Sequence, residues 1–353
     1  MSAIRLETQK LIRPMICDPE NWFIAARSDQ IKRRPLRRII LERPLVLFRD
    51  SSGRVSVLED RCPHKHVALS LGRVVGDSIE CPYHGLCFSG DGRCTAQPSR
   101  AQDEPLPQKR VPHFMVVEQD AWIWVYLGAN PAPPPPPRYE KTLGYGWFEL
   151  HNLMQAPMDL VLENGLDCSH TGIAHRGLFR SYPSQLVTSS IEETATGIRV
   201  RTTGERGSGG LDSMVLAGRG TAIEHIDAFI RPHTVRVDYW VRKAHFITIL
   251  ICTPETASRT RVYTRQGVLM PPVTALATLA SQLVTRKIVS QDKRILENQA
   301  AQIELFGGPS RIAMNADAPT RWLRRAFRAK SPASAATNAA YPGPRGEKVH
   351  YTL

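Results

Sequence analysis

The chain has 353 residues, of which 42% are hydrophobic, so it can bury a large core and exceeds the usual length of one domain. Its net charge is +13, and it contains no run of eighteen apolar residues of the kind that a transmembrane helix needs. The N-terminus lacks a signal-peptide-like apolar run, and the seven cysteines lack the spacing of a disulfide framework, so we expect a cytoplasmic protein with free thiols.

The first third of the chain predicts a small domain rich in β-strands. After a lead-in over residues 1–20, the segments WFIAA, RRIIL and PLVLF between residues 22 and 49 have the composition of strands. A further strand is expected at 54–59. The aromatic and β-branched segment at 121–128 predicts a buried strand that completes this domain.

A proline-rich segment predicts the boundary between two domains. Residues 130–138 read NPAPPPPPR, and consecutive prolines favour an extended, semi-rigid spacer. We therefore predict a first domain over 21–130, a linker over 131–138, a second domain over 139–330 and a C-terminal tail over 331–353.

The second domain predicts helices on both sides of a set of strands. Residues 158–175 predict a helix, 184–270 alternate apolar and polar residues as antiparallel strands do, and 273–306 predict another helix. The tail is rich in small residues, Pro and Gly, which predicts an extended or poorly ordered segment, with the terminal VHYTL available to a neighbouring subunit. The predicted fold class is α+β, a small β-rich domain followed by an antiparallel sheet flanked by helices.

Two cysteine–histidine pairs, Cys62-Pro-His64 and Cys81-Pro-Tyr-His84, are separated by sixteen residues. In a Rieske [2Fe–2S] cluster, two thiolates bind one iron and two imidazoles bind the other. A Cys2His2 zinc site uses the same ligand types, but zinc fingers place their two cysteines together and their two histidines together. Because each loop here supplies one of each, we predict the iron–sulfur cluster and keep zinc as the alternative.

A second constellation lies in the predicted helix at 158–175, which carries Asn164, Asp167, His170 and His175, while Asp292 lies in the later helix. Two histidines and one carboxylate form the facial triad of non-haem Fe(II) oxygenases. The histidines are five positions apart, too far for regular stacking on a helix, so we expect the helix to be interrupted near Gly172. The alternative is ordinary polar positions on a helix.

The two motifs together resemble the Rieske non-haem iron oxygenases (terminal oxygenase, or α, subunits), and the resemblance extends from about residue 22 to about residue 330. It implies a homotrimer or an α3-based assembly in which the cluster of one subunit reduces the iron of its neighbour. It makes His170, His175 and Asp292 the iron ligands. It also implies that Asp167 bridges His84 of one subunit and His170 of the next, and that Asn164 lies close to the iron, unless Asn164 is merely a polar position on the helix.

Within this family, the YHGL sequence ending at Leu86 and the chain length are similar to the vanillate and dicamba O-demethylase branch, whose members are monooxygenases. The segment QDKRILENQ is similar to the third-ligand segment of that branch, although Gln291 replaces an acidic residue. We therefore expect O2-dependent hydroxylation or oxidative demethylation of a hydrophobic, aromatic or polycyclic substrate. Cis-dihydroxylation of an aromatic ring and sterol-type oxidation are the enzymatic alternatives. A Rieske electron-transfer protein and a zinc-stabilised binding protein are the non-enzymatic ones.

The chain shows no dinucleotide-binding fingerprint, so electrons from NAD(P)H are expected to arrive through a separate ferredoxin or flavin reductase. Two basic clusters, at 32–38 and 321–330, suggest that this partner has an acidic surface, because opposite charges steer transient association. We expect no nucleic-acid binding, since neither cluster lies in a recognisable module. The segment RWLRRAFRAK is expected to be a helix that packs on its own domain, with a membrane-surface helix as the alternative.

Overall fold

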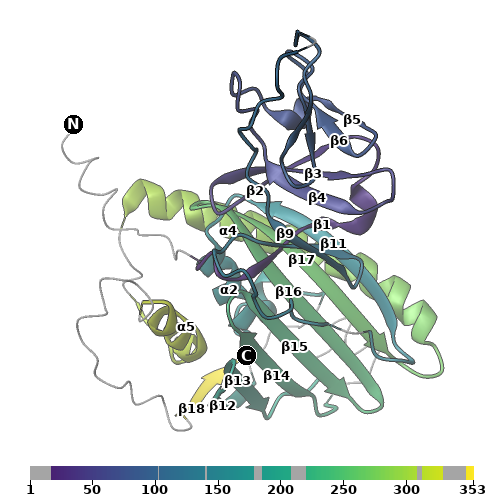
Figure 1. The fold of residues 1–353 in the computed structure, drawn as a ribbon. Coiled ribbons are helices and arrows are strands. Elements are labelled where there is room, and N and C mark those ends of the chain that lie inside the picture. The colour runs from purple at the N-terminus through teal and green to yellow at the C-terminus, as the bar shows by residue number, and fades with distance from the viewer. Residues whose placement is uncertain are drawn as a thin grey trace. The chain divides into compact units, whose positions relative to one another are not determined.

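The computed structural model describes residues 17–101, 103–139, 141–178, 185–207, 220–307, 312–328 and 347–353 (Figure 1). The described chain forms two compact units. One contains residues 17–140 together with the short segment 253–256, and the other contains the remaining described residues from 141 onward.

The first unit is built from three small antiparallel sheets. One has the order β1-β10-β9, from strands Trp22–Arg27, Trp122–Tyr126 and Met115–Gln119, and another has the order β2-β3-β4, from Leu36–Ile40, Arg43–Arg49 and Val55–Glu59. The strands predicted from the sequence at 22–49, 54–59 and 121–128 are therefore confirmed.

The third sheet of this unit supports the two cysteine–histidine loops. Its order is β5-β6-β7-β8, from Arg73–Val75, Ser78–Glu80, Cys87–Ser89 and Cys94–Ala96. A buried apolar cluster that includes Phe48, Leu58 and Phe88 packs around Cys62 and Cys81. Cys87 and Cys94 are buried thiols and form no disulfide, as expected from the sequence.

The second unit contains an eight-stranded antiparallel sheet of order β11-β17-β16-β15-β14-β13-β12-β18 (Figure 1). Its strands in chain order are β11 Gly146–Met154, β12 Leu186–Thr194, β13 Gly197–Thr203, β14 Glu224–Ile230, β15 Thr234–Val241, β16 Ala244–Thr256, β17 Arg259–Leu269 and β18 Glu347–Thr352. The antiparallel strands predicted over 184–270 are confirmed wherever that segment is described.

Helices of this unit pack on the sheet. They are α2 Met158–Leu166, α3 Thr171–Ala174, α4 Thr274–Phe306 and α5 Ala318–Arg328. The long α4 packs on β11 and β17, and α2 packs on β14 and β15 (Figure 1). Gly165 allows the close approach of α2, because a Cβ at this position would lie 3.2 Å from Leu250 and 3.3 Å from Val235. Among the described residues, no helix has both the length and the apolar composition needed to cross a membrane.

The predicted helix over 158–175 is interrupted, but not at Gly172. Helix α2 ends at Leu166, and Asp167 has extended backbone angles of φ −90° and ψ 96°. The Asp167 carboxylate accepts hydrogen bonds from the backbone N–H of Ser169 (2.8 Å) and from its hydroxyl (2.5 Å). Such local side-chain bonds compete with helical ones, so the interruption comes before His170 and a separate short helix, α3, follows.

The C-terminal residues differ from the expected tail. The described end, Glu347–Thr352, is a strand that pairs antiparallel with β12 at the edge of the chain's own sheet. Its alternating burial matches a strand with one face turned inward. VHYTL is therefore extended, as expected, but it pairs with the chain's own sheet, while the rest of that tail lies outside the described residues.

Helix α5 packs on its own unit, as predicted. Trp322 and Leu323 are buried, and Arg324 forms a bidentate ion pair with Glu163 of α2. Burial raises the pKa of Glu163, whereas the hydrogen bonds and charge of Arg324 act in the opposite direction. The net effect is a raised pKa of Glu163, and the ion pair ties α5 to the helix that precedes His170.

We predict that Arg324→Ala lowers the free energy of unfolding by about 1–3 kcal/mol at neutral pH, because it leaves the buried Glu163 carboxylate without its donor. Arg325→Ala is the matched control, since Arg325 is exposed on the same helix, and it should cost less than about 0.5 kcal/mol. Chemical denaturation of the two variants tests this. Equal stabilities would show that the ion pair does not hold α5 in place.

Candidate metal centres

The two cysteine–histidine loops share one backbone geometry. In each, the cysteine N–H donates to the carbonyl five positions later (2.8 Å in both), and the N–H four positions later donates back to the cysteine carbonyl (3.0 Å and 3.1 Å). That fourth position has a left-handed backbone in both loops, with φ 60° at His66 and φ 70° at Gly85. His66, which the sequence left without a role, is therefore the turn residue of its loop.

The four candidate ligands divide into a buried pair and an exposed pair. Cys62 and Cys81 are buried, while His64 and His84 are exposed, with ring centroids 4.6 Å apart. Burial raises the pKa of the Cys62 thiol, and the neighbouring Cys81 adds to this effect. Two adjacent buried thiolates need a bound cation, and the imidazoles lie on the solvent side of that position.

The spread of these donors favours a cluster of two metals over a single zinc. Donors around one tetrahedral zinc, each about 2.0–2.3 Å from the ion, lie within about 4 Å of one another. Among the described residues, only two groups of three or more donors lie within 4.8 Å of one another, and neither contains any of these four residues. The donor set and its spacing fit a [2Fe–2S] cluster with two thiolates and two imidazoles.

A second centre is formed where α3 meets α4. The Nε2 atoms of His170 and His175 lie 3.5 Å and 3.2 Å from Oδ1 of Asp292. These three residues form one of the two groups of closely spaced donors in the described chain. Ligands at adjacent positions of a six-coordinate ion about 2.1 Å away would lie about 3 Å apart, so the observed separations fit a single metal ion.

The other ring nitrogen of each histidine is already engaged. Nδ1 of His170 donates to the backbone carbonyl of Asp167, and Nδ1 of His175 lies 3.0 Å from the amide oxygen of Gln291. These partners favour the tautomer in which Nε2 carries the lone pair that a metal needs. The replacement of an acidic residue by Gln291, noted in the sequence, therefore preserves a hydrogen-bond acceptor behind His175.

The electrostatics of the three residues are those of a cation site. Burial would raise the pKa of Asp292, but when His170 and His175 are protonated their hydrogen bonds and charge outweigh burial and lower its pKa to about 2. A metal ion bound to the two Nε2 atoms would supply the same positive charge. Burial would lower the pKa of His170, yet Asp292 and Asp167 together raise it. A carboxylate that stays ionised beside two imidazoles provides the two nitrogens and one oxygen of a facial Fe(II) site with open positions.

The two remaining candidates lie beside this centre in different ways. Nδ2 of Asn164 is 3.4 Å from both Nε2 of His170 and Oδ1 of Asp292, so its side chain points at the ligand set. Asp167 has its carboxylate engaged with Ser169 and lies 3.8 Å from Nδ1 of His170. The Asn164 amide thus lies beside the three candidate ligands, and the Asp167 carboxylate lies behind His170.

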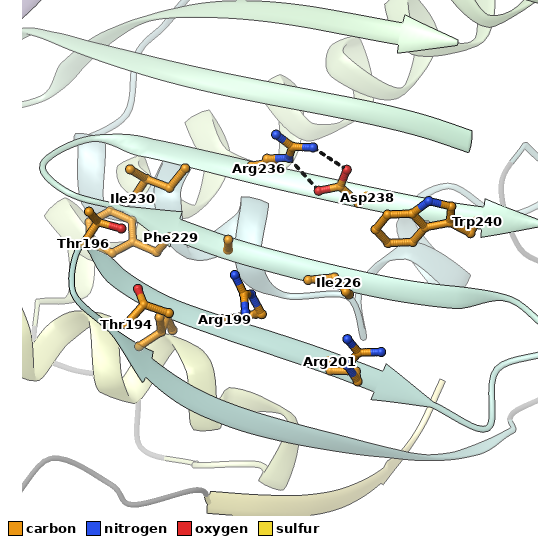
Figure 2. Close-up of a pocket in the computed structure, with 12 residues that line it drawn as sticks. Thr194, Thr196, Arg199, Arg201, Ile226, Phe229, Ile230, Arg236, Asp238 and Trp240 are labelled. Atoms are coloured by element: carbon orange, nitrogen blue, oxygen red, sulfur yellow. Dashed lines mark hydrogen bonds and ion pairs between the residues drawn. The ribbon is translucent and has the colours of Figure 1, made fainter. Parts of the chain in front are cut away.

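Sequence reasoning missed two features. Cys168, His225 and Asp227 form the second group of closely spaced donors, and no short motif signals it because the residues come from separate segments. The sheet also bears a hollow of about 400 Å³, shown in Figure 2, where Arg199, Arg236, Asp238 and Trp240 are among the lining residues. Three of its four β14 residues, Ile226, Ala228 and Ile230, alternate with His225 and Asp227, which places most of the hollow on the opposite face of the sheet from them.

Two family models match the two parts of the chain. Residues 21–115 match the family model of the Rieske [2Fe-2S] domain, and residues 154–331 match that of the vanillate O-demethylase oxygenase C-terminal domain. The oxygenase component of dicamba O-demethylase from Stenotrophomonas maltophilia is 30% identical over 229 residues, which is 62% of each protein. The oxygenase component of chloroacetanilide N-alkylformylase from Rhizorhabdus wittichii is 35% identical over 161 residues, or 44% of this chain and 45% of that protein.

These two alignments span less than two thirds of the relatives' own lengths. The fold comparison extends further. A crystal structure of dicamba monooxygenase bound to 3,6-dichlorosalicylic acid superposes with a TM-score of 0.75 at 22% identity, over 88% of this chain and 96% of that one. The β-rich first unit and the helix-flanked antiparallel sheet of the second therefore form a known combination of folds.

We predict that Gly85→Ala reduces the iron–sulfur content and the stability of the protein more than Gly76→Ala does. Both positions have positive φ, so both variants carry about 1–2 kcal/mol of backbone strain. At Gly85 the new Cβ would also lie 2.8 Å from Cγ of Pro98, whereas nothing lies within 4 Å at Gly76. Overpacking of this kind costs about 1–3 kcal/mol more.

The measurement is the ratio of acid-labile sulfide to protein, together with the melting temperature of each variant. Gly76→Ala controls for strain alone. Equal sulfide content and equal melting temperatures in the two variants would show that the close packing of Pro98 against Gly85 does not determine the conformation of the second ligand loop.

Proposed function

We propose that this chain, which belongs to the Rieske oxygenases with a vanillate O-demethylase-type C-terminal domain, is the terminal oxygenase component of a multicomponent monooxygenase. Its reaction is the hydroxylation or oxidative demethylation of a hydrophobic small molecule by O2. The observation that carries the proposal is the convergence of His170, His175 and Asp292 in the second unit of a chain whose first unit is a Rieske domain. A protein that only transfers electrons has no use for that second centre.

The roles of the residues follow from their positions. Cys62, His64, Cys81 and His84 would hold the [2Fe–2S] cluster, and His170, His175 and Asp292 would hold a mononuclear Fe(II). When bound, the two groups supply electron storage and the activation of O2. The chain itself fixes the tautomers of both iron-binding histidines and keeps Asp292 ionised. Asn164 places an amide N–H beside the open side of the ligand set, within reach of a polar atom bound there.

Asp167 is proposed to connect the two kinds of centre between subunits of a homotrimer, next to His84 of a neighbouring subunit. In this chain, Oδ1 of its carboxylate is held by Ser169 while its backbone carbonyl orients His170. A carboxylate fixed in this way behind a ligand imidazole can pass on changes in charge without moving the metal ligand.

The substrate class is proposed from the sheet and from the relatives. Val235 of β15 and Leu250 of β16 face α2 beside Gly165, so the part of the sheet that packs on the helix before His170 is apolar. The relatives are named for their action on dicamba and chloroacetanilides. We propose an aromatic substrate of comparable size that carries an O-alkyl or N-alkyl group. Hydroxylation of the carbon next to the heteroatom gives an unstable product that releases an aldehyde.

Electrons are proposed to come from NAD(P)H through a reductase or ferredoxin with an acidic surface. In the first unit, Lys32, Arg33 and Arg34 are exposed, so this cluster is available to such a partner. In the second basic cluster, Arg324 is engaged with Glu163. A reducing compartment suits the seven cysteine thiols, and we propose the cytoplasm.

The turnover test supplies the purified protein with NAD(P)H, an NAD(P)H-dependent reductase, a ferredoxin and a panel of methoxylated and N-methylated aromatic compounds. We expect formaldehyde release coupled to NAD(P)H oxidation for at least one compound, and its loss in Asp292→Ala together with the mononuclear iron. Asp292→Ala should keep its acid-labile sulfide. If Asp292→Ala retains both iron and turnover, the oxygenase assignment fails.

We predict that Gln291→Ala weakens binding of the mononuclear iron by about 10–100-fold, because His175 loses the acceptor that fixes its ring. Gln291→Glu should bind iron normally, since the acceptor is kept. Gln299→Ala is the control, because Gln299 is exposed on the same helix. Iron content after dialysis against graded chelator measures the effect, and unchanged retention in Gln291→Ala would contradict it.

We predict that Asp167→Asn retains both the cluster and the mononuclear iron but loses most of its turnover. The amide can still accept from Ser169, so the turn before His170 is kept, while the negative charge behind His170 is removed. Ser169→Ala serves as the control for the turn alone. Full activity in Asp167→Asn would exclude a role for this charge in coupling the two centres.

A further inference from the structure

A row of polar side chains crosses the inner face of the sheet beneath the segment between α2 and α3. The hydroxyl of Tyr351 lies 2.8 Å from that of Ser189, which lies 2.7 Å from that of Thr202. His225 is the cross-strand partner of Thr202, and Tyr239 stacks on its ring at 4.0 Å. These residues belong to five adjacent strands, β18, β12, β13, β14 and β15.

Cys168, from the segment between α2 and α3, contacts the Tyr351 end of this row. Its Sγ is 2.7 Å from the hydroxyl of Tyr351, and it lies with donor atoms of His225 and Asp227 inside a group whose members are all within 4.8 Å of one another. Cys168 is 8% exposed, His225 0% and Asp227 2%. A thiol, an imidazole and a carboxylate are thus gathered in the interior, apart from the His170–His175–Asp292 group.

The hydrogen bonds of the described protein do not satisfy this group. Nε2 of His225 lies 2.9 Å from Oδ1 of Asp227, but Oδ2 of Asp227 and Nδ1 of His225 are buried without a hydrogen-bond partner. Glu205, which is 4% exposed, places Oε2 3.5 Å from Nδ1 of His225. Burying a carboxylate oxygen without a donor is unfavourable, so the pocket favours an additional positive group.

A protonated His225 between its two carboxylates explains the 2.9 Å contact but leaves Oδ2 of Asp227 without a donor. A divalent cation bound to Nε2 of His225, to Asp227 and to Cys168 accounts for the 2.9 Å contact and also gives Oδ2 of Asp227 a partner. The hydrogen on Nδ1 would then point at Glu205. A carboxylate behind a metal-bound histidine is the usual arrangement that fixes its tautomer and orientation.

We propose that Cys168, His225 and Asp227 form a second mononuclear metal site, with Glu205 behind His225, that takes a thiophilic divalent transition metal such as Zn²⁺. One sulfur, one nitrogen and one oxygen donor exclude Ca²⁺ and Mg²⁺, which prefer oxygen ligands alone.

The site has a structural consequence for the neighbouring centre. Cys168 stands between Asp167 and His170, in the segment that leaves α2 and presents the first histidine, whereas His225 and Asp227 belong to β14. A metal bridging them fastens this segment to the sheet at one further point. The proposal does not depend on the oxygenase function, because the two groups share no ligand.

The experiment uses the full-length protein with its cluster and mononuclear iron in place, as verified by iron and sulfide analysis. The protein is mixed with one equivalent of Zn²⁺, passed through a desalting column and examined by elemental analysis and by X-ray absorption at the zinc edge. We expect about one zinc per chain, with a sulfur neighbour at about 2.3 Å.

Variants assign the sulfur and keep the test independent of folding. Cys168→Ser should lose the sulfur signal, and Cys252→Ser, at a buried thiol of β16 outside the group, should keep it. Asp227→Asn, which is close to isosteric, should weaken zinc binding by at least about tenfold while the sulfur signal remains. Asp292→Ala should lose its mononuclear iron and still show zinc bound to sulfur.

Two results overturn the proposal. One is a wild-type protein that retains no zinc or binds it through nitrogen and oxygen only. The other is a sulfur signal that persists unchanged in Cys168→Ser, which would place the zinc at other cysteines. Neither result affects the iron content on which the oxygenase assignment rests.

Discussion

The second unit depends on one contact, in which the carboxylate of Asp292 meets Nε2 of His170 and of His175. The carboxylate comes from the middle of a 33-residue helix, and the imidazoles come from a short segment more than one hundred positions earlier in the chain. One buried and two half-buried groups of this kind are unfavourable together unless they share a charge that balances them. Their convergence is therefore the strongest structural evidence for the chemistry of this protein.

The surrounding structure can be understood as the means of presenting those imidazoles. Gly165 lets α2 approach the sheet closely, the Asp167 carboxylate ends the helix, and the short α3 then carries the chain to His175. A continuous helix would turn two residues five positions apart toward different directions. The interruption between α2 and α3 is therefore what brings the two histidines together. It is stabilised by the local hydrogen bonds between Asp167 and Ser169.

The first unit was predictable because its information is local. Each ligand loop is short, its proline restricts the backbone, and the strands around it are marked by apolar and β-branched runs. Even the role of His66 could have been found by aligning the two loops, since it occupies the position that Gly85 takes in the second.

Pairing Asp292 with the histidines needed the family resemblance, because no local pattern links α4 to α3. The strand at 347–352 was missed because a short alternating segment follows a stretch rich in small residues, and only the exposed edge of β12 gives it a partner. The group of Cys168, His225 and Asp227 was invisible for the same reason, since its members come from a loop and a strand that only the fold brings together.

The proposed reaction requires that one chain hold both an iron–sulfur cluster and a separate iron ion. The most direct test is the joint determination of iron and acid-labile sulfide in the protein purified without added metal under anaerobic conditions. The account predicts about three iron atoms and about two sulfides per chain, since a Rieske cluster contributes two of each. Zinc in place of iron, or iron without sulfide, would contradict it.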